Sequence, residues 1–239
     1  MKILSVDTST PRLSVAIWEN GEVLGLSERF PERRHAETIL TEIEQVLRER
    51  QLSPRDIGAL AVGLGPGSFT GLRVGIATVQ GIAQALQLPV AGVSSFQVIA
   101  AGTHADLVLV LEDARQGMFY AALYERRAND YVPRMAESLL TWDALVLALP
   151  ESGVCTLAGP AVVQWQPQLA QAKPGIAFEL VPEAFRLPSA VTLAGLAAAA
   201  LAAGGTVPEA LIPLYLRRTQ AEEMKARQNA ARLGGNRHA

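Results

Sequence analysis

Gly63-Leu-Gly-Pro-Gly-Ser-Phe-Thr-Gly-Leu-Arg-Val-Gly75 connects an apolar run, Ile57 to Val62, to a helical pattern. Glycine permits left-handed backbone and close approach of other chain segments, and proline fixes one bend. Ser68 or Thr70 is suited to cap the helix that follows, because a hydroxyl there can accept a free backbone N–H. The stretch therefore predicts a buried strand, a tight loop and a capped helix.

Such a loop could cradle phosphate, but its chemistry does not match an ATP-binding P-loop. A P-loop ends in Gly-Lys-Ser/Thr, whose lysine reaches the phosphates and whose hydroxyl holds Mg²⁺. Here Gly71 is followed by Leu72 and Arg73, and the lysines of the chain are Lys2, Lys173 and Lys225. A P-loop is excluded.

The helix that follows, residues 72–86, has two stripes. Large apolar residues recur at helical spacing on one side, which predicts a buried face. Small residues follow another line, and glycine inside a helix costs about 1 kcal/mol relative to alanine, so tight packing is expected there. Either the protein's own sheet or a helix of a partner can supply that packing. With a neighbouring amphipathic helix, residues 35–50, the candidate partner interface comprises His35, Ile39, Gly71, Arg73, Gly75, Thr78 and Ala85.

The chain repeats one arrangement of elements. An apolar strand, Ile3 to Val6, ends at Asp7, and a second, Leu107 to Leu111, ends at Glu112-Asp113. Each is followed by a strand–turn–strand pattern, with Asn20-Gly21 and Asn129-Asp130 at the turns, and then by alternating helix and strand. The pattern predicts two α/β lobes of order βββαβαβα, residues 1–103 and 104–216, followed by a polar tail, residues 217–239.

Bulk composition narrows the class of protein. The 239 residues carry a formal net charge of −2, which gives no global electrostatic reason to bind nucleic acid. One cysteine, Cys155, excludes an intramolecular disulfide and a cysteine-based zinc site. The apolar run Ala190 to Ala203 is shorter than the ~20 residues that span a membrane, so a buried helix capped by Ser189 is expected, and with no signal-peptide pattern we expect a cytoplasmic protein.

The glycine stretch resembles the signature of the TsaB (YeaZ) family, which acts in tRNA threonylcarbamoyladenosine (t6A) synthesis. Further matches span residues 3 to 217: Ile3-Leu-Ser-Val-Asp-Thr-Ser-Thr10, Asp113-Ala-Arg-Gln-Gly117 with Tyr120, and Pro213-Leu-Tyr-Leu-Arg217. The resemblance implies two ribonuclease-H-like lobes of the actin, Hsp70 and sugar-kinase superfamily. It also implies helix-to-helix docking with the catalytic protein TsaD, or with a second copy when alone, and a ternary complex with the ATPase TsaE.

In that superfamily two strand-ending aspartates flank an ATP–Mg²⁺ cleft. By position, Asp7 and Thr8 are candidates for a vestigial nucleotide site, but the second loop carries Ala114-Arg115 where an early glycine is expected. The alternative is that Asp7 and Asp113 cap turns by accepting backbone N–H groups. We therefore expect no cofactor held by this chain alone, with ATP or ADP confined to an interface in the complex.

The sequence lacks residues that two enzymatic alternatives require. TsaD carries a His-x-x-x-His metal pair, whereas His35 is followed four positions later by Ile39, and the other histidines, His104 and His238, are isolated. Ser68 lies in Gly-x-Ser-x-Thr, which differs from the Gly-x-Ser-x-Gly nucleophile turn.

The expected function is that of a non-catalytic subunit. It activates TsaD, which modifies the adenosine at position 37 of tRNAs reading ANN codons. A weak kinase-like ATPase or a glycoprotease-like hydrolase is the alternative. The basic tail is expected to be solvated, with tRNA contact weak or indirect.

Overall fold

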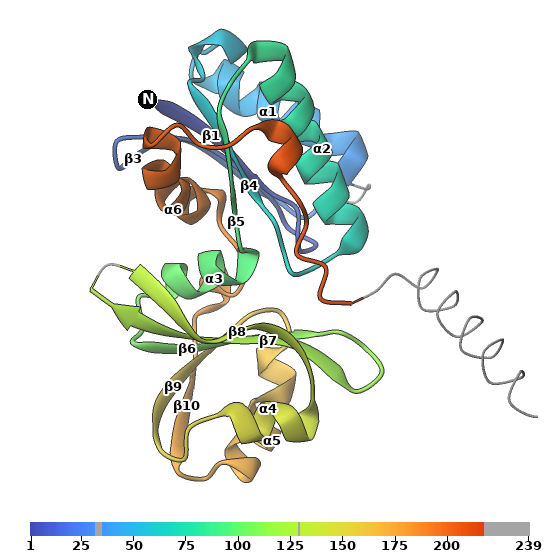
Figure 1. Ribbon diagram of the computed structural model, residues 1–239, viewed down its shortest axis with the longest axis vertical. Coiled ribbons are helices and arrows are strands. Elements are labelled where there is room, and N and C mark those ends of the chain that lie inside the picture. Colours follow the sequence, from blue (N-terminus) through green and yellow to red (C-terminus); the bar gives the residue numbers. More distant parts are fainter. Residues whose placement is uncertain (32–34, 129, 218–239) are drawn as a thin grey trace, which may run out of the picture.

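The computed structural model describes residues 1–31, 35–128 and 130–217, and it has two α/β lobes (Figure 1). Asn129 and the predicted tail from residue 218 lie outside the described residues. The first repeat comprises β1 (Lys2–Asp7), β2 (Leu13–Glu19), β3 (Glu22–Arg29), α1 (His35–Glu49), β4 (Ala59–Gly63), α2 (Phe69–Leu86), β5 (Val90–Val93) and α3 (Ser95–Thr103). The second comprises β6 (Leu107–Asp113), β7 (Met118–Arg127), β8 (Asp130–Thr141), α4 (Trp142–Ala148), β9 (Gly153–Ala158), α5 (Val162–Ala172), β10 (Ile176–Leu180) and α6 (Ala190–Ala202).

The two sheets have the same topology. In the first, β1 pairs antiparallel with β2 and parallel with β4, giving the order β3-β2-β1-β4-β5. In the second, β6 holds the same central place in the order β8-β7-β6-β9-β10. This repetition confirms the predicted duplication into two ribonuclease-H-like lobes. At the predicted turn of the first hairpin, Asn20 and Gly21 have positive φ angles, as a tight hairpin requires.

Each sheet has its outer face covered by helices of its own repeat. Helices α1 and α2 cover the first sheet and α4 and α5 the second, so the outer helices lie at the two ends of the molecule (Figure 1). The last helix of each repeat is exchanged between the lobes, so that it packs on the sheet of the other repeat. Helix α3 packs on β6, β7 and β8 of the second sheet, whereas α6 packs on β1, β2 and β5 of the first.

This exchange corrects the boundary predicted at residue 216. The inner face of the first sheet carries Ile3, Ala59, Ala61 and Ala91, and these mostly small side chains admit the alanine-rich α6 closely. Residues 190–211 therefore belong with the first lobe, because Leu211 also joins the core under α1 and α2.

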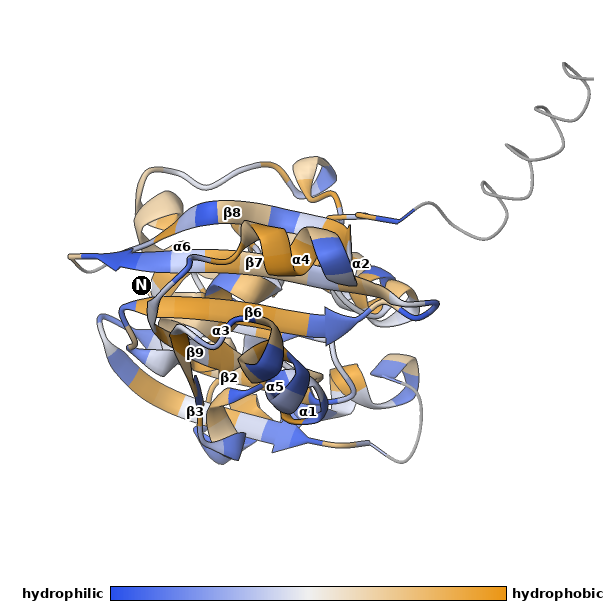
Figure 2. Cartoon of the chain, turned by 90° about the horizontal axis from the view of Figure 1, so that it is seen from below, coloured by the Kyte–Doolittle hydropathy of each residue, from blue (hydrophilic) through white to orange (hydrophobic). Residues whose placement is uncertain are grey.

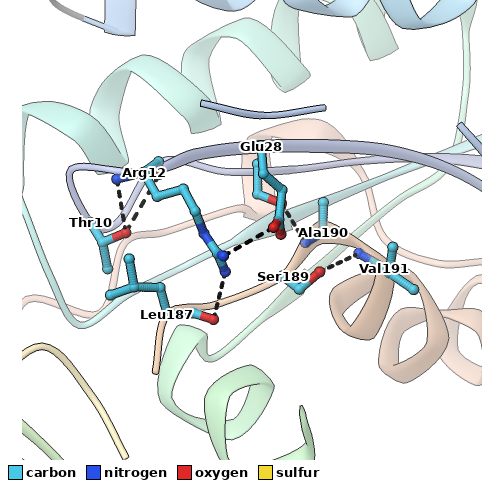
Figure 3. Close-up of polar contacts among 8 residues, drawn as sticks. Thr10, Arg12, Glu28, Leu187, Ser189, Ala190 and Val191 are labelled. Carbon is cyan, nitrogen blue, oxygen red and sulfur yellow. Dashed lines mark hydrogen bonds and ion pairs between the residues drawn. The ribbon is translucent and has the colours of Figure 1, made fainter. Parts of the chain in front are cut away.

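Buried polar groups hold the start of α6 against the first sheet (Figure 3). Ser14 Oγ accepts the Ala190 N–H at 2.8 Å, and Ser5 Oγ donates to the Ala190 carbonyl at 2.7 Å. Arg12, which is 6% exposed, donates from its guanidinium to Glu28 Oε2 at 3.0 Å and to the Leu187 carbonyl at 2.8 Å. These bonds fix the segment by which the chain returns from the second lobe.

Residues 183–202 are long and apolar enough to cross a membrane by length and composition, a test that core helices also pass. Within this range the α-helix has 13 residues, Ser189 caps it as predicted, and it packs on the first sheet. The structure thus uses this apolar run as a core helix.

Candidate functional site

The turn after β1 is buried, and both carboxylate oxygens of Asp7 are engaged. Oδ1 accepts the Ser9 N–H at 2.9 Å and the Ser9 hydroxyl at 2.7 Å, and Oδ2 accepts the Ser95 hydroxyl at 2.7 Å. Burial raises the pKa of Asp7 from its ordinary value, while these hydrogen bonds oppose that shift. The turn-capping role weighed for Asp7 is confirmed.

The glycine loop, residues 63–68, closes over this turn. Ser68 N–H donates to the Ser9 carbonyl at 2.7 Å, and the Thr8 hydroxyl donates to the Gly71 carbonyl at 2.8 Å. A Cβ on Gly67 would lie 2.3 Å from the Ser9 carbonyl oxygen, so only glycine permits this approach. The polar groups of Asp7 and Thr8 are thus committed within the chain, and nucleotide binding by them stays a prediction without structural support.

At the matching end of β6, two acidic residues have different surroundings. Asp113 is exposed and accepts the Arg115 N–H at 2.7 Å, which confirms the turn-capping role weighed for it. Glu112 Oε2 is buried and has no hydrogen-bond partner in the described part of the chain. Burial, with the charges of Asp7 and Asp113, raises the pKa of Glu112 to about 7. Figure 2 shows β6 as hydrophobic along most of its length and hydrophilic at this end. From its sequence pattern Glu112 is predicted only as the end of a strand, because nothing in that pattern marks an unpaired carboxyl.

Three of the seven predicted interface residues face inward. Ile39 is 1% exposed and belongs to the core under α1. Gly71 and Gly75 are buried against the turn after β1, and a Cβ on Gly75 would lie 2.2 Å from Thr8 Oγ1. The small-residue stripe of α2 is therefore not one outward face, and these two glycines serve packing within the chain.

The other four residues are more accessible. Ala85 is exposed and Thr78 is half-buried on α2. Arg73 is exposed, with its guanidinium carbon 3.9 Å from the centre of the Phe69 ring. His35 is half-buried, and its Nε2 lies 2.9 Å from the Thr10 carbonyl oxygen. Partner contact for these residues stays a prediction.

Between α1 and α2 lies an apolar groove of about 150 Å³. Leu40 on its rim is 55% exposed, and Ile82 and Leu86 on α2 are half-buried. None of these three residues is among the seven predicted interface residues, although their helical spacing places them beside the core stripe. The groove is lined by Leu4, Leu40, Ile43, Glu44, Leu47, Pro54, Ile57, Leu60, Ile82 and Leu86.

The structure offers little to the hydrolase and metal alternatives. Within residues 1–31, 35–128 and 130–217, no three His, Cys, Asp or Glu side chains converge on a possible metal position. Ser68 Oγ accepts the Gly71 N–H at 3.2 Å as the cap of α2. Its hydroxyl therefore has the helix-capping role that the sequence predicts.

Comparisons with known proteins place this arrangement among relatives. A family model described as TsaD, tRNA N6-adenosine threonylcarbamoyltransferase, matches residues 25–225. The tRNA threonylcarbamoyladenosine biosynthesis protein TsaB of Escherichia coli is 44% identical over 133 residues, which cover 54% of this chain and 57% of that protein. TsaB of Bacillus subtilis is 31% identical over 147 residues, 59% of this chain and 64% of that protein. These alignments span less than two thirds of either relative. The structure of YeaZ from Pseudomonas aeruginosa is 31% identical with a TM-score of 0.74, covering 90% of this chain and 99% of that one.

Proposed function

The chain belongs to the TsaB (YeaZ) family, whose named relatives act in t6A synthesis, and from that premise we propose that it is a non-catalytic subunit that binds and activates TsaD. TsaD would transfer the threonylcarbamoyl group to adenosine 37 of tRNAs reading ANN codons. The observation that carries the proposal is the apolar groove between α1 and α2, with an exposed leucine on its rim.

The shape and chemistry of this groove suit a helix of a partner. An amphipathic helix binds by laying its apolar side chains into a groove of this kind. Leu40 is 55% exposed to water, and burying an aliphatic side chain against a partner contributes about 1.5–3 kcal/mol. Ala85, at the far end of α2, is small enough to let a second helix approach closely.

The turn after β1 is the reason why we propose a non-catalytic subunit. Stabilisation of developing charge is usually the largest catalytic term, and it requires polar groups free to face the substrate. Both oxygens of Asp7 accept hydrogen bonds from serines, and the Thr8 hydroxyl donates to Gly71. We therefore favour a non-catalytic subunit over a kinase-like ATPase. For a hydrolase, no nucleophile and base can be assigned among these hydrogen-bonded groups.

The wider assembly follows from family membership. The proposal includes TsaE in a ternary complex, ATP or ADP at an interface of that complex, and a homodimer when the chain is alone. Contact with tRNA would be weak or indirect, and the complex would work in the cytoplasm. Each of these belongs to the proposal.

Two substitutions, one on the rim of the groove and one beside the groove residue Leu86, test the docking face, and we call them the groove variants. Leu40→Glu places a carboxylate where a partner's apolar side chain would lie, and Ala85→Arg adds bulk and charge on α2. Leu147→Glu on α4 is the matched control, because Leu147 is 84% exposed on the other lobe. All three variants should keep the wild-type melting temperature. The two groove variants should bind purified TsaD at least about 30-fold more weakly, because each buries an unpaired charge in the interface.

A reconstituted reaction gives the second measurement. TsaD and TsaE with either groove variant should form t6A on tRNA far more slowly than with wild type or Leu147→Glu. Normal binding by both groove variants would place the docking face elsewhere. Steady ATP hydrolysis by the purified chain alone, lost in Asp7→Ala, would refute the non-catalytic part of the proposal.

A further inference from the structure

The last described segment of the chain, residues 208–217, runs along α2 and then reaches the other lobe; we name it the C-terminal strap (Figure 1). Its beginning is anchored in the first lobe. Leu211 is 5% exposed in the core, and Gln80 Nε2 on α2 donates to the Pro208 carbonyl at 2.9 Å. This end is held by buried apolar contact as well as by hydrogen bonds.

The middle of the strap is fixed to the glycine loop and the start of α2. Leu214 N–H donates to the Leu64 carbonyl at 2.8 Å. The rings of Tyr215 and Phe69 lie with their centres 5.0 Å apart, and Arg73 Nε donates to the Tyr215 hydroxyl at 2.9 Å. Arg73 also lies over the Phe69 ring, so a cation and two aromatic rings form one stack.

Beyond this stack the Arg217 side chain reaches the second lobe. Arg217 Nη1 donates to the Ala114 carbonyl at 2.9 Å, and Nη2 donates to Gln116 Oε1 at 2.6 Å. Both acceptors lie in the β6–β7 hairpin. Arg115 and Gln116 have φ angles of +65° and +56°, a conformation that side chains other than glycine, asparagine and aspartate seldom adopt. Arg217 therefore hydrogen-bonds to a hairpin whose backbone is strained.

From this asymmetry we propose that the C-terminal strap is a releasable brace that sets the relative orientation of the two lobes, with Arg217 as its fastening residue. The first-lobe end has a buried leucine and an aromatic stack. The second-lobe end has a half-buried guanidinium and hydrogen bonds. Release therefore breaks the Arg217 contacts first. The lobes then pivot about the segments where the chain crosses between them, residues 93–95 from β5 to α3 and residues 186–189 before α6. The proposal does not depend on which partner binds the groove.

Distance measurements between the lobes test the brace. Gln84→Cys on α2 and Leu147→Cys on α4 provide one exposed label site in each lobe. Cys155 is 0% exposed, and burial raises the pKa of its thiol to about 12, so it stays unlabelled by maleimides. Spin labels or a fluorophore pair at the two sites report the interlobe distance distribution in the full-length chain.

Arg217→Ala should shift or broaden that distribution, and Gln116→Ala should change it in the same direction while leaving the strap intact. Arg134→Ala, which removes an exposed positive charge from β8, should leave it unchanged. In Arg217→Ala, hydrogen exchange of the Met118 amide, which donates to the Arg115 carbonyl within the hairpin, should accelerate about tenfold or more. The melting temperature shows that each variant is folded.

Two results would overturn the brace. An unchanged distance distribution in folded Arg217→Ala would show that other contacts set the lobe orientation. Faster exchange in the hairpin with unchanged distances would reduce Arg217 to a local tether. If Arg217→Ala does not fold, Gln116→Ala decides between the same outcomes.

Discussion

At the scale of single residues, two glycines of α2 show how surroundings decide the effect of one substitution. A Cβ on Gly75 would lie 2.2 Å from Thr8 Oγ1, whereas a Cβ on Gly81 would meet nothing within 4 Å. Gly75→Ala should therefore lower the free energy of unfolding by about 1–3 kcal/mol through overpacking. Gly81→Ala should raise it by about 0.5–1 kcal/mol, because alanine favours an exposed helix. Urea unfolding of both variants checks the pair, and equal signs would contradict the packing of Gly75 on Thr8.

Glu112 makes the free energy of unfolding depend on pH, and the direction of its pKa shift sets the sign of that dependence. Burial and neighbouring charges raise its pKa from 4.5 to about 7, so the folded state binds the proton more tightly than the unfolded state. As pH rises from 4.5 to 7, the free energy of unfolding falls, and the penalty is complete above pH 7. Glu112→Gln removes the ionisation. It should match wild type near pH 4.5 and be more stable by up to about 3 kcal/mol at pH 8.

Urea unfolding at the two pH values measures this difference. Glu183→Gln, which changes an exposed carboxyl, should show no such pH dependence. A stability gain of Glu112→Gln that is equal at both pH values would show that the pKa of Glu112 is the same in the folded and unfolded states.

The side toward which Gly75 faces could not be predicted from the sequence. A helical pattern gives the angle between residues around an axis but leaves open whether a stripe of small residues meets the chain's own backbone or another molecule. The turn-capping role of Asp7 was foreseen as an alternative, because Asp and Ser after a strand commonly cap turns. The engagement of its second oxygen by Ser95 depends on a contact between residues 88 positions apart, which local patterns do not encode.

At the scale of elements, the start of α6 depends on a buried serine of β2. Ser14 Oγ accepts the Ala190 N–H, and Ala190 is 0% exposed, so Ser14→Ala would leave a buried donor without an acceptor. The expected loss of unfolding free energy is about 1–3 kcal/mol. Ser138→Ala on β8 is the control, because the Ser138 hydroxyl bonds to the Ala136 carbonyl at an exposed site. Thermal or urea unfolding compares the two, and equal losses would remove the special role of Ser14.

Most elements were predictable because their signals are local. The apolar strand, the glycine loop and the Ser68 cap follow one another in the sequence before α2. The helix begins at Phe69, directly after that cap. The destination of α6 was not predictable. An alanine-rich helix that is apolar nearly all round has no face that selects one sheet over another, so its order in the chain wrongly assigned it to the second lobe.

At the scale of the whole molecule, the exchange of α3 and α6 predicts that neither lobe is an independent folding unit. A fragment of residues 1–106 keeps β1–β5 but lacks α6, which leaves Ile3, Ala59, Ala61 and Ala91 uncovered. We expect this fragment to bind hydrophobic dyes and to give a poorly dispersed amide NMR spectrum, whereas the chain through residue 217 is folded. A well-dispersed spectrum from the fragment would show that α6 is dispensable for the first lobe.

The exchanged helix also has a consequence for how the protein is made. A ribosome completes β5 at residue 93, yet the helix that covers this sheet ends at residue 202. At ~5–20 residues per second, the intervening synthesis takes roughly 5–20 s. During that interval the nascent first lobe presents an uncovered apolar face, and molecular chaperones bind such surfaces. The first lobe to leave the ribosome is thus the last to be finished.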